Sequence, residues 1–106
     1  MRALKLISIE SSQLKLNILP EYGGRIINFT SGDFNVFRPI PVDKINLDEA
    51  YKGGSFALVP FSNRIKNAEF YFDDISYKID ENASPHSIHG HGNLASWNVV
   101  KNTNSS

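Results

Sequence analysis

The chain has 106 residues, of which 41% are hydrophobic and 11% aromatic, so it can bury one small core. Its formal net charge is zero, with 11 basic and 11 acidic side chains, which argues against nucleic acid or a membrane surface as partner. Cysteine is absent, which excludes disulfides and thiolate chemistry. Because Lys5 interrupts the first apolar run, we expect no signal peptide and no membrane span, and hence a cytoplasmic protein.

The first third of the chain alternates apolar and polar residues with a period of two, which is typical of β-strands. Two such runs, residues 4–9 and 14–18, are separated by a short polar segment and predict an antiparallel hairpin. The glycine pair at 23–24 precedes another apolar run, residues 26–29, and residues 34–37 are a further short strand candidate.

Residues 38–52 predict a long connection. Pro39 and Pro41 stand at alternate positions, which excludes a central strand, and the residues that follow them are mixed and polar. We expect at most one helical turn here, over residues 47–51. Connections of this length in small domains are often functional.

The second half of the chain contains the clearest hairpin, in which residues 70–72 and 75–79 flank a turn at Asp73 and Asp74. The apolar run 56–61 and residues 96–100 are the remaining strand candidates. No segment shows a sustained helical period. The prediction is therefore one all-β, antiparallel domain spanning residues 1–106.

The best candidates for acid–base catalysis lie in residues 86–91, which contain all three histidines of the chain. Imidazole can give or take a proton near neutral pH. If this segment is extended, His89 and His91 share one face, and a cupin-like metal site that also uses His86 is conceivable. A metal site normally needs three or four well-placed ligands, and no acidic residue follows Glu81, so we expect no metal.

The three histidines are expected to differ in role. We expect His86 and His91 to cap turns or face solvent. His89 stands between Ile88 and Gly90, which suggests an imidazole that points from a buried strand into a space kept open by glycine. His89 is therefore the candidate catalytic residue.

Asn63 and Arg64 form a second candidate site. Guanidinium offers five donors in a rigid fork, which suits sugar hydroxyls or carboxylates. Because a strand over residues 56–61 must end at Pro60, Arg64 can project into a cleft. The plainer interpretation is a surface arginine paired with Glu69 or Asp73.

Taken together, these segments resemble the aldose 1-epimerases, or galactose mutarotases. The residues that carry the resemblance, in the order and spacing of the family's N-terminal part, are 23–26, 53–56, 58–65, 70–79, 86–90 and Trp97. The similarity extends over nearly the whole chain, from Leu4 to Lys101. The most specific part of it is the combination of Asn-Arg-Ile at 63–65 with Ile-His-Gly at 88–90.

The resemblance implies a large antiparallel β-supersandwich, of which this chain would be the N-terminal part. It also implies cofactor-free interconversion of the α and β anomers of a free aldose such as glucose or galactose. By the same resemblance, Asn63 and Arg64 contact sugar hydroxyls, and His89 contacts the sugar near the ring oxygen. The expected partner is therefore an aldohexose.

The family's other catalytic groups, a second histidine as general acid and a glutamate as general base, lie later than residue 106. We therefore expect an N-terminal fragment that is inactive alone and whose uncovered sheet self-associates. A non-catalytic carbohydrate-binding module of the same fold, and an enzyme that acts on a phosphorylated hexose, remain alternatives.

Overall fold

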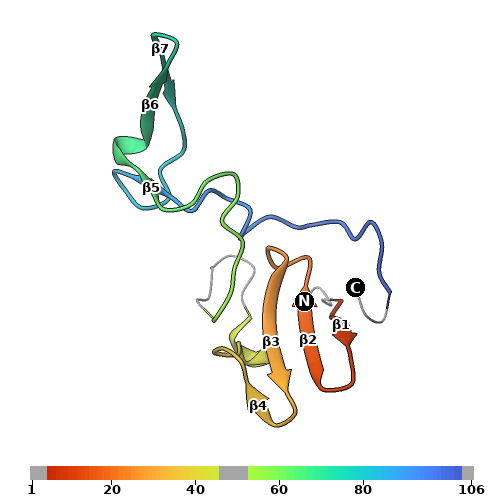
Figure 1. Ribbon diagram of the computed structural model, residues 1–106. Helices are drawn as coiled ribbons and strands as arrows, with labels where there is room; N and C mark the ends of the chain where they lie inside the picture. Colours follow the sequence, from red (N-terminus) through yellow and green to blue (C-terminus); the bar gives the residue numbers. More distant parts are fainter. Residues whose placement is uncertain (1–4, 46–52, 104–106) are drawn as a thin grey trace. The chain divides into compact units, whose positions relative to one another are not determined.

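Regular structure in the computed structural model is almost entirely β (Figure 1). The structure describes residues 5–45 and 53–103, and the helical turn expected at 47–51 lies outside them. The helices among these residues are single 3₁₀ turns, too short to span a membrane. These residues form two units: unit 1 contains residues 5–45, 53–57 and 93–103, and unit 2 contains residues 58–92.

Unit 1 contains a four-stranded antiparallel sheet in the order β1–β2–β3–β4, drawn in red to yellow in Figure 1. Its strands are β1 (Ile7–Glu10), β2 (Leu14–Leu19), β3 (Arg25–Ser31) and β4 (Phe34–Asn35). Ile7 pairs with Ile18, and Leu14 pairs with Ser31. Short turns join strands whose side chains alternate between faces, and these two properties fix the register. The predicted N-terminal hairpin is confirmed.

The core of unit 1 is small. Leu19, Tyr22, Ile27 and Ile40 are buried together, and Ile45 packs against them. The proline-containing segment before the 3₁₀-helix η1 (Val42–Lys44) forms no strand, as predicted. It still contributes Ile40, whose N–H donates to the carbonyl oxygen of Ile27 at 2.8 Å and so anchors the connection to β3.

Arg25 is buried in unit 1, with only 1% of its surface exposed. Its guanidinium lies 4.8 Å from the ring centre of Tyr22 and 5.2 Å from that of Phe56, and Nη2 donates to the carbonyl oxygen of Asn93 at 2.9 Å. Burial lowers the pKa of this guanidinium, and the charge interaction with Tyr22 opposes that shift. The side chain of Arg25 thus contacts Phe56, which precedes unit 2 in the sequence, and Asn93, which follows it.

The strand predicted over residues 96–100 is wrong, because this segment has no regular structure. Isolated hydrogen bonds join this part of the chain to the turn between β2 and β3. Gly23 donates its N–H to the carbonyl oxygen of Ala95, and Trp97 donates its N–H to that of Pro20, each at 2.9 Å. A turn offers single acceptors and donors at these points and not the repeating row that a strand needs.

Unit 2 contains a hairpin, a short ladder and the 3₁₀-helix η2 (Lys66–Ala68). The hairpin pairs β6 (Glu69–Phe72) with β7 (Ile75–Lys78), and the ladder pairs β5 (Arg64–Ile65) with β8 (Ser87–Ile88). Asp73 and Asp74 form the hairpin turn, with φ angles of 49° and 63°. Positive φ at both turn residues matches the twist of the strands, so the predicted hairpin and its turn are confirmed.

The strand predicted over residues 56–61 is wrong as well. The run makes one isolated parallel bridge, between Val59 and Gly90. Pro60 has no N–H to donate, so a ladder cannot continue past Val59 on that side. The apolar run is therefore a connection that enters unit 2.

Candidate functional site

Asn63 and Arg64 lie where the chain enters β5. Asn63 has a left-handed backbone (φ 57°), which asparagine tolerates better than most residues. Arg64 begins β5 and pairs with Ile88 of β8 in the antiparallel ladder. Both Asn63 and Arg64 are exposed, so their side-chain donors face solvent.

His89 follows β8 directly, but residues 88–91 are not extended as predicted. His89 has φ 62° and Gly90 has φ 61°, so the chain turns at this point and the face shared by alternate residues is lost. The N–H of His89 donates to the carbonyl oxygen of Asn63 at 2.7 Å. This bond extends the contact between the two segments by one residue, so the backbones of Asn63, Arg64 and His89 occupy neighbouring positions.

The expectation that Gly90 keeps a space open is wrong. A Cβ atom at Gly90 would run into the backbone carbonyl of Val59. That carbonyl also accepts the N–H groups of His91 and Gly92, each at 2.9 Å. Glycine is needed here because the backbone is left-handed and a neighbouring backbone lies in contact with it. The turn after His89 is therefore tightly held.

Asn82 is the residue at this site that the sequence did not single out. Its amide Nδ2 donates to the carbonyl oxygens of Ile88 at 2.8 Å and Gly90 at 3.1 Å. Its Oδ1 accepts the N–H of Ile88 at 2.6 Å. The two residues that flank His89 are thus bonded to one side chain. The available signal was an asparagine in the loop before the histidines, a residue type whose amide often bonds to nearby backbone.

The other histidines have different surroundings. His86 accepts the N–H of Asn67 at its Nδ1 atom, at 2.9 Å, which fits the predicted turn-capping role. His91 is exposed, as expected. Across residues 5–45 and 53–103, no three His, Cys, Asp or Glu side chains are grouped so that they could hold a metal ion. The geometry therefore does not support the cupin-like alternative.

The chemical character of the site is that of a hydrogen-bonding surface. Arg64 supplies a fork of donors and Asn63 an amide that both donates and accepts. His89 is half-buried, and its Nδ1 atom is shielded from solvent. In the hairpin of β6 and β7, hydrogen bonds from Ser76 and Tyr71 lower the pKa of the Glu69 carboxyl group.

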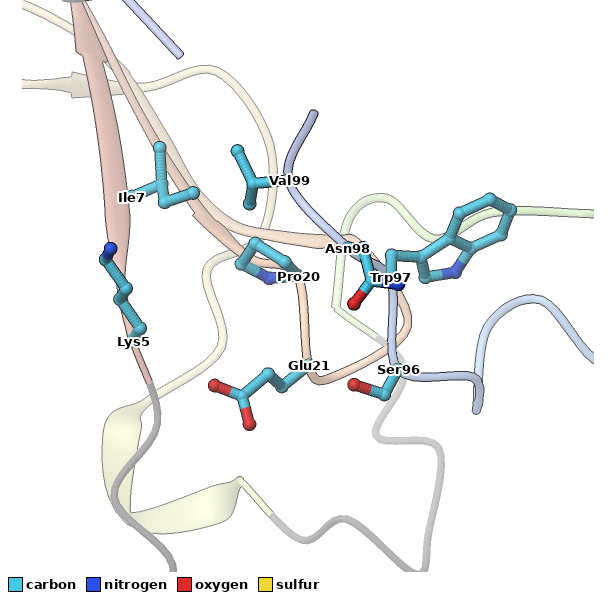
Figure 2. A pocket seen from close by; sticks show the side chains of 8 residues that line it. All are labelled: Lys5, Ile7, Pro20, Glu21, Ser96, Trp97, Asn98 and Val99. Atoms are coloured by element: carbon cyan, nitrogen blue, oxygen red, sulfur yellow. The ribbon is translucent and has the colours of Figure 1, made fainter. Parts of the chain in front are cut away.

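Unit 1 has a pocket of its own, of about 320 Å³ (Figure 2). Its lining consists of Lys5, Ile7, Pro20, Glu21, Ser96, Trp97, Asn98 and Val99. In Figure 2 the indole ring of Trp97 points away from the side chains of Lys5 and Ile7. None of the three predicted site residues lines this pocket.

Comparison with known proteins identifies the family. The sequence profile of the aldose 1-epimerases matches residues 5–106. The uncharacterized protein YphB of Escherichia coli K12 is 27% identical over 105 residues, which are 97% of this chain and 34% of that protein.

Two solved structures share the fold. A putative aldose 1-epimerase from E. coli K12 superposes with a TM-score of 0.80 at 26% identity. A GalM/aldose epimerase homologue from C. elegans superposes with a TM-score of 0.74 at 28% identity. In each case the match covers 96% of this chain and 34% of the other, so this chain spans about a third of the length of these relatives. Its fold is antiparallel all-β and galactose mutarotase-like, and the chain belongs to the aldose 1-epimerase family.

Proposed function

We propose that this chain provides the sugar-contacting part of an enzyme that interconverts the α and β anomers of a free aldohexose. Asn63 and Arg64 hydrogen-bond to sugar hydroxyls, and His89 contacts the sugar at the ring oxygen. The observation that supports this assignment is the 2.7 Å hydrogen bond from the N–H of His89 to the carbonyl oxygen of Asn63. It links two segments that are far apart in sequence and that both carry polar side chains suited to a polyhydroxylated ligand.

The chemistry assigns one end of the reaction to His89. Opening a pyranose ring requires a base at the anomeric hydroxyl and an acid at the ring oxygen, each within hydrogen-bond reach of its proton. His89 serves the ring-oxygen end. We expect the complementary acid and base in the part of the family's length that this chain does not span. Each such group typically contributes about 100- to 10,000-fold to the rate, so this chain alone should bind sugar with little turnover.

Binding is tested by titrating the chain with galactose and glucose while following the NMR signals of the Arg64 guanidinium and the His89 ring. Arg64→Ala should weaken binding by about tenfold or more, because several hydrogen bonds to hydroxyls are lost together. Lys66→Ala is the matched control, since it removes another exposed cation from the same segment. Equal affinity of the two variants would contradict the proposal.

Two further measurements refine the assignment. Polarimetry of freshly dissolved α-galactose should show the same relaxation with the chain as with buffer, and clear acceleration would mean that the chain already holds a complete acid–base pair. A titration with galactose 6-phosphate separates free from phosphorylated hexoses. Markedly tighter binding of the phosphate would contradict a free aldose as ligand.

A further inference from the structure

Asn82 makes a set of contacts that a loop residue does not need for its own conformation. The loop is already closed by Ala83 and His86, which exchange backbone hydrogen bonds at 3.0 and 2.8 Å. The side chain of Asn82 is nevertheless committed to Ile88 and Gly90. Asn82 itself is exposed, so its amide could be solvated by water without these bonds.

The bonds of Asn82 surround one residue. Its amide pairs with both the N–H and the C=O of Ile88, as a neighbouring strand would, and it also reaches the C=O of Gly90. His89 lies between Ile88 and Gly90, and its left-handed backbone is uncommon for a residue with a Cβ atom. Such a conformation persists where the surroundings determine it from several sides.

His89 is also held through its own N–H, which donates to the carbonyl oxygen of Asn63. That bond fixes one peptide group and leaves the orientation of the following peptides to Asn82 and to the contact between Gly90 and Val59. Asn82 makes its contacts through a side chain, whereas the other contacts named here are between backbone groups. Substitution can therefore remove the contacts of Asn82 without altering the backbone path directly.

We propose that Asn82 is a positioning residue for His89. Its amide holds the peptides on either side of His89 so that the imidazole keeps one orientation toward the bound sugar. The role in sugar contact rests on the proposed function, whereas the effect on the backbone at His89 does not. The two parts can be measured separately.

The test compares three variants of the full chain. Asn82→Ala removes all of these bonds, and Asn82→Asp keeps an acceptor for the N–H of Ile88 but loses both donations. Ser84→Ala is the control, since it removes a hydrogen bond to Glu81 from the same loop and leaves residues 88–90 untouched. The readouts are amide exchange at Ile88, the chemical shifts of His89, and the galactose titration.

For Asn82→Ala we expect exchange at Ile88 to accelerate by about tenfold or more, the His89 signals to shift, and galactose affinity to fall by about tenfold. Asn82→Asp should keep Ile88 protected and still bind galactose more weakly, a combination that a purely structural role would not give. Ser84→Ala should change none of these values more than about twofold.

Unchanged His89 shifts and unchanged affinity in a folded Asn82→Ala variant would overturn the proposal. If Asn82→Ala does not fold, Asn82→Asp decides: wild-type affinity and wild-type His89 shifts overturn it. If the wild-type chain shows no response to galactose at Arg64 or His89, the proposed function fails. The positioning role is then judged by the His89 shifts alone.

Discussion

Two glycines in unit 1 allow the cost of a close backbone contact to be separated from the cost of backbone conformation. Gly23 and Gly32 both have left-handed backbones, with φ angles of 70° and 57°. A Cβ atom at Gly23 would run into the backbone carbonyl of Asn93, whereas at Gly32 it would meet nothing within 4 Å. Gly23→Ala and Gly32→Ala are therefore a matched pair.

The two variants should differ in stability because the carbonyl of Asn93 accepts a hydrogen bond from Arg25. A left-handed backbone costs a residue with a Cβ atom about 1–2 kcal/mol, and both variants carry this cost. At Gly23 the added methyl group must also displace a carbonyl that accepts a hydrogen bond from the buried guanidinium of Arg25. A hydrogen bond to a charged group contributes about 1.5–3 kcal/mol. Gly23→Ala should thus lose about 2 kcal/mol more than Gly32→Ala.

The free energy of unfolding of both variants is measured by urea titration, with the fluorescence of Trp97, the single tryptophan, as the signal. A Cβ atom at Gly24 would lie 3.5 Å from the ring of Trp97, so the probe reports on the turn that contains Gly23. If Gly23→Ala is unfolded without urea, the same amount of an osmolyte added to all samples restores the transition. Equal losses for the two variants would refute the argument that the contact with Asn93 sets the cost.

Three further predictions concern unit 2. Asp74→Gly should stabilise the chain by up to about 1 kcal/mol in thermal unfolding, since glycine adopts the positive φ of this turn position without strain; a loss would contradict the turn geometry. Ser76→Ala should raise the pKa of Glu69 in a carbon-13 NMR titration, because a hydrogen bond to the carboxylate is lost. Since the folded pKa lies below the unfolded one, this bond stabilises above the unfolded pKa, and its effect disappears as pH falls through the folded value; an unchanged pKa would refute this. His86→Ala should cost about 1 kcal/mol and accelerate amide exchange at Asn67, whereas unchanged exchange would show that the Nδ1 bond does not form in solution.

Local pattern predicted the parts of the fold that depend on neighbours in sequence. The hairpin of β1 and β2 and the hairpin of β6 and β7 each join two strand-forming runs through a short turn, and both were predicted correctly. The strands expected at 56–61 and 96–100 failed for a different reason. Whether such runs form a ladder depends on partners such as Gly90 and Pro20, which lie far away in the chain.

In the candidate site, too, the sequence predicted the features that depend on residue type and missed those that depend on distant partners. Residue chemistry and the resemblance selected Asn63, Arg64 and His89, and the structure brings their backbones together. The turn at His89 could not be predicted from residues 88–91 alone, because contacts with Val59 and Asn82 hold it. The sugar itself, the cytoplasmic location and the self-association of the sheet remain predictions.

The buried guanidinium of Arg25 affects how far the length of segment 58–92 can vary among relatives. It contacts Phe56 just before unit 2 and Asn93 just after it, so the segment 58–92 is tied at its base by one side chain. The entropy of closing such a loop grows only slowly with its length. Unit 1 should therefore keep its fold after insertions or deletions in the hairpin of β6 and β7, which contains none of the proposed site residues, as long as the contacts of Arg25 are kept.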